Sequence, residues 1–562
     1  MEKEWTIMVY MAGDNNLNDD MIRAINELRE SIKTTGDALS RSGSIGGKNN
    51  IGILIEFDGE HPLRRPLRYD LTYTNSRTYD NDSAGEPTSH IISTTSSIQE
   101  PTIKDSVRDF IEFSIQTQPA NNYCLIFSGH SDAFQGRTLL VDENPAGTTT
   151  LAEIRDVLNK IVDEKLGGKF QILGFDGCVM NTVEVMYEFN NVTETWIGSQ
   201  GSIPNFTWDY QKIAQKLINE PTASLTREKV LDTIIECVSN FNSKYSFGGR
   251  SVDISTAKID LPEFNESSDL INNGAFLLFA LLGFYLRPDS LAFNHLLRIL
   301  LSAHWNCQSY MRNQSIDSVD FAERLTQECR KSVREIFANS EILADIKISC
   351  EPFTVAEMEK IEDISKEMKL SAEAQELVWL LHIISSYCDN LVLKLRKVFH
   401  GCFTGVDYQF SNGGSLFMPW SLLGYKMSLA NYRKLKFSEK LGWILFIALY
   451  VRLTARPKPK IELWKTLEGI LNFLPPTLEE FILENNFLIS LSSNFKSDSI
   501  NKSITERFDE ETIKKTLVVL LGEDGMRDNP NRTKGLDNYL YYFEKTTNFF
   551  PDLTDDKKGC FP

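Results

Sequence analysis

Long apolar runs and an excess of positive charge are both missing from this sequence of 562 residues. The longest apolar run, 275–286, is between half and two-thirds of the ~20 residues that a membrane-spanning helix needs, so we expect it in a buried core. The 59 basic residues are outnumbered by 77 acidic ones, and the formal charge is -18. This balance argues against nucleic acid or an anionic membrane as a partner.

Paired cysteines and an export signal are also missing. The nine cysteines are odd in number, widely spaced and without a CxxC pair, which argues against a disulfide framework and a zinc module. We expect neither a metal site nor a cofactor. Polar residues at the amino terminus lead directly into an apolar strand, without the segments of a signal peptide. We therefore expect a cytoplasmic protein with reduced cysteines.

Residues 1–260 instead contain a regular alternation of apolar strands with amphipathic helices. The expected strands are 6–11, 51–57, 123–127, 170–175 and 195–198, and the expected helices are 19–33, 104–116, 151–160 and 182–189. This alternation predicts an α/β fold, with a mainly parallel sheet sandwiched by helices. Ligands of such sheets bind at the carboxyl ends of the strands, which directs the search for a site.

The length of the chain is enough for several packed units, and the pattern divides it into four parts. An α/β core covers 1–260, and a helical insertion covers 261–400. A returning strand and helix, 401–458, complete the core, and the strand region contains a turn at 412–414. The C-terminal extension, 459–562, has no assigned role.

A histidine and a cysteine follow two of the expected strands. His130 follows the strand 123–127, and Cys178 follows the strand 170–175. If these strands are neighbours, the two side chains meet at one edge of the sheet, as a thiol nucleophile and its imidazole base require. Taken singly, each residue is more often a buried structural one, and the pairing at two strand ends favours catalysis.

The surroundings of Cys178 suit attack on a carbonyl group. A neighbouring imidazolium and the amino terminus of the following helix would lower the pKa of its thiol. The backbone N–H groups of Cys178 and Ser131 would stabilise the oxyanion, and Gly177 would allow a tight turn. A rival pair, His400 and Cys402, lies in a segment that we interpret as the end of a helix with a glycine stop.

Three segments resemble the clostripain family of cysteine peptidases, which belongs to the caspase-like clan. They are Trp5 to Leu17 (WTIMVYMAGDNNL), Leu125 to His130 (LIFSGH) and Ile172 to Phe189 (ILGFDGCVMNTVEVMYEF). The resemblance implies a caspase/hemoglobinase-like sandwich for the core. It also implies that His130 is the general base and that Cys178 is the nucleophile.

The sequence departs from the family pattern at three positions near the proposed dyad. Ser131 stands where the family usually has glycine, Gly177 where it usually has alanine, and Gly201 where it often has an acidic residue. Activation in the family can involve cleavage after a basic residue between histidine and cysteine. The loop expected at 142–150 contains no lysine or arginine, so we predict a chain that stays intact or is activated differently.

The resemblance also implies cleavage after arginine or lysine, which requires a carboxylate in the substrate pocket. Asp176 is the best candidate because it lies two residues before Cys178, on the same face of an extended segment. Asp209 and Asp132 are alternatives. Each of the three can also be interpreted as a helix cap or a turn residue, and for Asp209 and Asp132 that is the preferred interpretation.

The sequence thus predicts a cysteine endopeptidase with a His130/Cys178 dyad that acts on proteins or peptides with basic residues. We expect the helical regions to restrain the activity or to respond to a regulatory partner. Two alternatives stay open. One is a catalytically silent caspase-like scaffold, and the other is a signalling or defence protease with one dedicated protein substrate.

Overall fold

The fold was analysed in a computed structural model of the whole chain. It describes residues 2–41, 50–59, 66–71, 102–131, 133, 139–143, 146–204, 207–244, 252–284, 291–310, 314–338, 363, 365–366, 369–404, 407–420, 432, 434–440 and 442–454. The predicted extension 459–562 and Asp132 lie outside these residues.

Eight of the described strands form one sheet, in the order β12-β9-β8-β7-β4-β1-β2-β3. They are β1 (Lys3–Gly13), β2 (Ile51–Gly59), β3 (Leu67–Asp70), β4 (Ala120–Ser128), β7 (Phe170–Asp176), β8 (Thr193–Gly198), β9 (Val252–Lys258) and β12 (Phe399–Thr404). The five central strands, β8, β7, β4, β1 and β2, run parallel, and β3, β9 and β12 pair antiparallel with their neighbours. The five expected strands and the mainly parallel sheet are confirmed.

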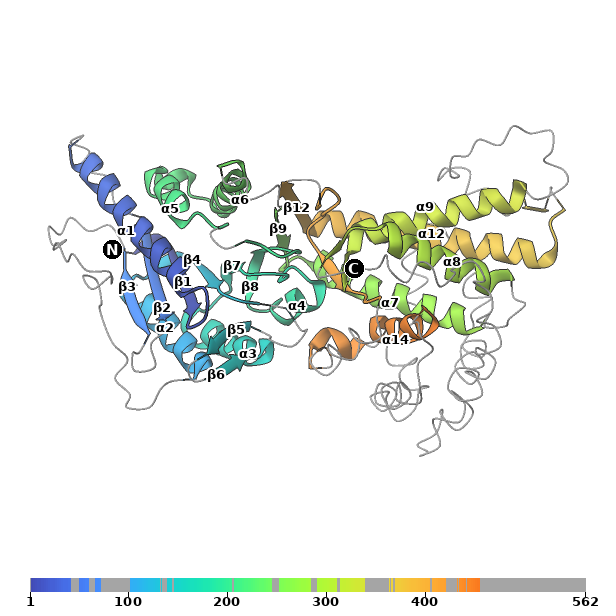
Figure 1. Ribbon diagram of the computed structural model, residues 1–562, viewed down its shortest axis with the longest axis horizontal. Helices are drawn as coiled ribbons and strands as arrows, with labels where there is room; N and C mark the ends of the chain where they lie inside the picture. Colours follow the sequence, from blue (N-terminus) through green and yellow to red (C-terminus); the bar gives the residue numbers. More distant parts are fainter. Residues whose placement is uncertain are drawn as a thin grey trace, which may run out of the picture.

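Helices cover both faces of this sheet, and each face has its own buried cluster (Figure 1). One face is covered by α1 (Asn18–Arg41), α5 (Tyr210–Asn219) and α6 (Arg227–Lys244), which pack on side chains such as Ile7 and Val9. The other is covered by α2 (Ile103–Thr117), α3 (Leu151–Ile161) and α4 (Val183–Glu188), which pack on Met8 and Tyr10. The continuous apolar character of β1 follows, because both of its faces are buried.

The elements between β9 and β12 are mainly helical and lie beyond one end of the sheet (Figure 1). They are α7 (Pro262–Phe284), α8 (Leu291–Asn306), β10 (Ser309–Tyr310), β11 (Ser315–Asp317), α9 (Ser318–Ala338) and α12 (Ala372–Val398). Leu281 of α7 and Leu380 of α12 belong to the same buried cluster as Met8 of the sheet. The described helices of the insertion therefore share a hydrophobic core with the sheet. No helix in the described ranges has both the length and the apolar character to cross a membrane.

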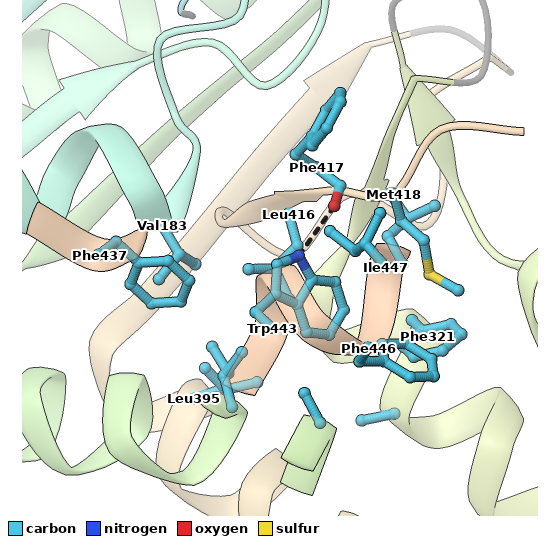
Figure 2. Close-up of a cluster of buried hydrophobic side chains, with 14 of the residues drawn as sticks. Val183, Phe321, Leu395, Leu416, Phe417, Met418, Phe437, Trp443, Phe446 and Ile447 are labelled. Atoms are coloured by element: carbon cyan, nitrogen blue, oxygen red, sulfur yellow. Dashed lines mark hydrogen bonds between the residues drawn. The ribbon is translucent and has the colours of Figure 1, made fainter. Parts of the chain in front are cut away.

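The returning segment joins the sheet region to the helices. It contains β13 (Ser415–Phe417) and α14 (Gly442–Thr454), with a 3-10 turn at Lys436–Lys440 between them. β13 pairs with β11 of the insertion. In Figure 2, Trp443 lies in the buried cluster and donates its indole N–H to the Phe417 carbonyl at 2.8 Å. This bond fixes α14 beneath β13.

Two sequence interpretations were wrong. His400 and Cys402 lie in β12 and not at a helix end, because α12 stops at Val398 and the chain then pairs with the open edge of β9. Gly401 does not end a helix. It lets the backbone at Ser411 pass close by, since a Cβ at residue 401 would lie 2.6 Å from the Ser411 carbonyl oxygen. The loop expected at 142–150 is largely a hairpin of β5 (Leu139–Glu143) and β6 (Ala146–Thr149).

Candidate active site

The strands that precede His130 and Cys178 are neighbours, as the proposed site requires. β4 and β7 run parallel in register, with Ser128 opposite Asp176. The Gly129 N–H continues the pairing by donating to the Asp176 carbonyl at 3.1 Å. The loops that carry the histidine and the cysteine therefore leave the same edge of the sheet side by side.

His130 is held by an asparagine from the turn after β1. Its Nε2 lies 2.6 Å from Asn16 Oδ1. Asn15 shapes that turn, because its side chain donates to the Ala12 carbonyl at 2.9 Å and accepts from the Leu17 N–H at 2.9 Å. With the Asn16 amide in this orientation, Nε2 donates to Oδ1, which leaves Nδ1 as the ring nitrogen able to accept a proton. The sequence did not mark Asn16 as a site residue, because aspartate and asparagine are common in turns for structural reasons alone.

Cys178 is half-buried, and this burial opposes ionisation of its thiol. Its Sγ lies 3.8 Å from the Ile203 carbonyl oxygen. Burial raises the pKa of the Cys178 thiol above its usual range. Hydrogen bonds with the Ile203 backbone and the Ser202 side chain lower this pKa, but by less. The expected lowering of this pKa is therefore wrong for the described surroundings. One reason is that α4 begins only at Val183, too far along the chain to act as a helix terminus at the sulfur.

The turn after Cys178 is strained. Val179 has φ 54°, a left-handed conformation that a β-branched side chain rarely adopts. It is nevertheless buried, and its N–H donates to the Gly201 carbonyl at 2.9 Å. Such conformations persist where the surrounding structure enforces them, and they concentrate at active sites.

Ser131 joins the two loops through its side chain. Its hydroxyl donates to the Cys178 carbonyl at 2.8 Å. Gly177 makes room for this contact, because a Cβ at residue 177 would overlap Ser131 Oγ and lie 2.8 Å from the Gly129 carbonyl oxygen. The two departures from the family pattern at 131 and 177 are therefore one structural feature. The backbone segments that carry the expected oxyanion donors, Ser131 and Cys178, are tied together by it.

Asp176 is a partly buried residue that lies two positions before Cys178. Its Oδ2 accepts hydrogen bonds from the Ser128 hydroxyl at 2.9 Å and the Tyr210 hydroxyl at 2.8 Å. Burial raises the pKa of Asp176 to about 6, although these two hydrogen bonds lower it in part. A cationic side chain next to this carboxylate would favour its ionised form.

Asp209 serves as the N-cap of α5. Its carboxylate accepts from the Lys212 N–H at 3.0 Å and forms an ion pair with the Lys212 ammonium group. The cap starts the helix at Tyr210, whose hydroxyl contacts Asp176. Asp209 is therefore linked to Asp176 through the next residue, Tyr210, and its described contacts are those of a helix cap.

A buried carboxylate that the sequence did not reveal organises the loop facing Cys178. Asp253 of β9 accepts from the Ser199 hydroxyl at 2.7 Å, the Gln200 N–H at 2.6 Å and the Gly201 N–H at 2.9 Å. These bonds hold the loop that continues into Ser202 beside the thiol. In the sequence, Asp253 is one of several polar residues in the strand segment VDISTAK, which is not a signal for a site.

The same loop is connected to the insertion and to the returning segment. The Gln200 side chain donates to Asp317 at 3.0 Å and accepts from the Gly413 N–H at 2.8 Å. The described part of the chain contains no group of histidine, cysteine or carboxylate side chains arranged to hold a metal ion. The loops at this edge of the sheet carry a cysteine, a histidine and a carboxylate side chain.

Comparison with known proteins identifies one family. The model of the clostripain family matches residues 9–464. An inactive zymogen C11 protease from Parabacteroides distasonis is similar in structure, with 15% identity, a TM-score of 0.45, and coverage of 78% of this chain and 98% of its own. A secreted C11 cysteine protease from Bacteroides thetaiotaomicron, solved with an irreversible peptide inhibitor, has 14% identity, a TM-score of 0.48, and coverage of 78% and 99%. No curated protein matches the chain significantly.

Proposed function

The chain belongs to the clostripain family and is a cysteine endopeptidase, and we propose that His130 and Cys178 form its catalytic dyad. The observation that supports this most is the pairing of β4 with β7, which ends both strands at one edge of the sheet. The bond between His130 Nε2 and Asn16 supports Nδ1 as the base. The raised pKa of Cys178 fits a thiol that loses its proton only during the reaction.

The proposed reaction passes through an acyl-enzyme. His130 takes the thiol proton, and Cys178 Sγ attacks the peptide carbonyl carbon. The oxyanion is stabilised by the backbone N–H groups of Ser131 and Cys178. The C–N bond breaks as the imidazolium gives its proton to the leaving amine. His130 then activates a water molecule, which hydrolyses the thioester and restores the thiol.

We propose that Asp176 selects arginine or lysine before the scissile bond. The hydrogen bonds from the Ser128 and Tyr210 hydroxyls both end on Oδ2, and Asp176 lies two residues before Cys178. Charge-assisted hydrogen bonds from a guanidinium or an ammonium group give this contact its strength. The proposed function thus has two parts, which are the His130/Cys178 dyad and the preference for a basic residue before the scissile bond.

One set of peptide assays tests both parts. Full-length protein is incubated with reporter peptides that carry arginine, lysine or glutamine before the cut. Cys178→Ala should remove cleavage, and His130→Ala should lower kcat by roughly 10²–10⁴-fold. Asp176→Asn should lower kcat/KM for the basic peptides by roughly 30-fold or more, because a desolvated charge loses its partner.

Two matched variants serve as controls. Cys237→Ala removes another buried thiol, in α6, and should retain activity. Asp209→Asn keeps the helix cap and should change kcat/KM little. Cleavage by the Cys178→Ala protein would remove that residue from the mechanism. A loss of basic preference in Asp209→Asn but not in Asp176→Asn would reverse the assignment of the pocket carboxylate.

A further inference from the structure

The loop after β8 is hydrogen-bonded to the turn that carries the nucleophile. The Gly201 carbonyl accepts the Val179 N–H at 2.9 Å, and the Ser199 carbonyl accepts the Asn181 N–H at 3.0 Å. The two donors follow Cys178 by one and three residues. A displacement of this loop would therefore move the backbone on which the thiol is carried.

Gln200 lies between the two acceptors, and its side chain connects the loop to distant parts of the chain. Its amide nitrogen donates to Asp317 Oδ2 at 3.0 Å, and its amide oxygen accepts the Gly413 N–H at 2.8 Å. A carboxylate accepts and a backbone N–H donates, so the two partners fix the orientation of the amide. Gln200 and Asp317 are both fully buried, and water therefore cannot easily replace the bond between them.

Asp317 is the point at which the helical insertion meets this amide. It ends β11 and caps α9, because its Oδ1 accepts the N–H groups of Val319 at 3.0 Å and Asp320 at 2.8 Å. Its Oδ2 accepts the Asn412 N–H at 2.7 Å in addition to the Gln200 amide. From this cap, α9 runs through the part of the insertion that lies beyond the end of the sheet (Figure 1). One buried carboxylate thus joins the start of a long helix to the loop beside the nucleophile turn.

We infer that Gln200 is a positioning residue for Cys178, and that the insertion holds it in place through Asp317. This rests on the proposed role of Cys178 as the nucleophile. Asp253 fixes the loop to the sheet through the N–H groups of Gln200 and Gly201, and Asp317 fixes the same loop to the insertion. A displacement of ~1 Å from the productive geometry can lower a rate by roughly 10²-fold, so loss of the second anchor should slow the chemical step.

Gln200→Met tests the inference from the side of the loop. Methionine has a similar length and volume, but it can form neither of the two hydrogen bonds of the amide. The variant should lower kcat for a reporter peptide by about 10- to 100-fold and change KM by less than about 3-fold. This split is expected because the defect lies in the placement of the thiol and not in substrate binding.

Asp317→Asn tests the same link from the side of the insertion. Its side-chain oxygen can still cap α9, but its NH2 group faces the amide nitrogen of Gln200. The value of kcat should fall by a similar factor. The double variant Gln200→Met/Asp317→Asn should lose little more than the more affected single variant, because both changes break one link. Losses that multiply in the double variant would overturn the inference.

Tyr387→Phe is the matched control. It also removes a buried hydrogen bond of the insertion, from the Tyr387 hydroxyl to the Leu270 carbonyl at 2.8 Å, but this bond joins α12 to α7. The variant should retain kcat per folded molecule, with the folded fraction taken from urea unfolding at the assay pH. An equal loss of kcat in Tyr387→Phe would overturn the inference, because a general loss of stability would then explain the results.

Alkylation of Cys178 with iodoacetamide gives a readout that needs no substrate. Its rate constant should change in Gln200→Met and Asp317→Asn but not in Tyr387→Phe, because it depends on the exposure and ionisation of the thiol. A folded Gln200→Met protein that keeps either the wild-type kcat or the wild-type alkylation rate overturns the inference and leaves the proposed function intact. If Gln200→Met does not fold, Asp317→Asn is judged by the same criteria. Cleavage by Cys178→Ala would instead overturn the proposed function, and the inference with it.

Discussion

Ser131 and Gly177 form a complementary pair at the active site. The serine hydroxyl occupies the space that an alanine Cβ at residue 177 would need, and it donates a hydrogen bond to the Cys178 carbonyl. Considered alone, serine at residue 131 or glycine at residue 177 would suggest a site that has lost its catalytic function. Together they keep the two loops packed, which fits an active enzyme.

The pair can be tested by a double-mutant cycle. Gly177→Ala should lower kcat by at least about 10-fold, because its Cβ would displace the nucleophile turn. Ser131→Gly in the same chain should restore part of this loss. Only part is expected, since the contact with the Gly129 carbonyl remains. The test is to measure kcat for both single variants and for the double variant. If the change in kcat of the double variant equals the product of the two single changes, the residues are not coupled and the prediction is wrong.

The sequence could predict that His130 and Cys178 lie at one edge of the sheet, because each follows a recognisable buried strand. It could not predict the contacts that Asn16 and Asp253 make there. Their contacts join segments that are far apart in the chain, and no local pattern marks them. Asp209 shows the opposite case, since one of its two interpretations from the sequence was a helix cap, and it is the N-cap of α5.

At the scale of elements, the sequence predicted the central strands because apolar runs buried on both faces are distinctive. It failed where a partner decides the conformation. The glycine in residues 399–404 was interpreted as a helix stop, yet these residues form β12 because β9 offers an edge with which they pair. The β5–β6 hairpin was missed for a related reason, since its polar residues resemble those of a loop.

Glu184 connects α4 with the returning segment. Its Oε1 accepts the Phe417 N–H at 2.8 Å and lies 3.4 Å from the Tyr432 hydroxyl, while its Oε2 is buried without a partner among the described residues. Burial raises the pKa of Glu184 to about 7. The protonated form is thus favoured in the folded protein, and the stability it contributes is lost as the pH rises through about 7.

Glu184→Gln should flatten this dependence. The amide keeps an acceptor for Phe417 and does not ionise. The variant should gain free energy of unfolding relative to wild type between pH 5 and 8, by at most about 3 kcal/mol. Urea unfolding at pH 5.5 and pH 8 measures the difference, and Glu164→Gln in the exposed turn after α3 is the matched control. Parallel wild-type and Glu184→Gln profiles would contradict the prediction.

At the scale of the whole molecule, we predict that the chain works without being cut between His130 and Cys178. Residues 142–150 contain no lysine or arginine, and most of them are paired in the β5–β6 hairpin. Arg155 and Lys160 lie within α3, where the helical backbone does not offer the extended conformation that a protease cleft binds.

A denaturing gel of protein after incubation shows whether the chain has been cut between His130 and Cys178. Wild type and Cys178→Ala should both remain at full length while wild type cleaves reporter peptides. Rapid conversion of wild type alone into two stable fragments, with a new terminus within 137–170, would contradict it. Mass spectrometry of the fragments would locate the cut.

The pairing of β9 with β12 also has a consequence during synthesis. A ribosome makes the 140 residues between Lys258 and Phe399 before β12 exists, which takes roughly 7–30 s at ~5–20 residues per second. A sheet that forms as soon as β9 has emerged keeps an open edge for that interval, and open edges recruit other strands. Stalled translation ahead of β12 would therefore release chains prone to self-association.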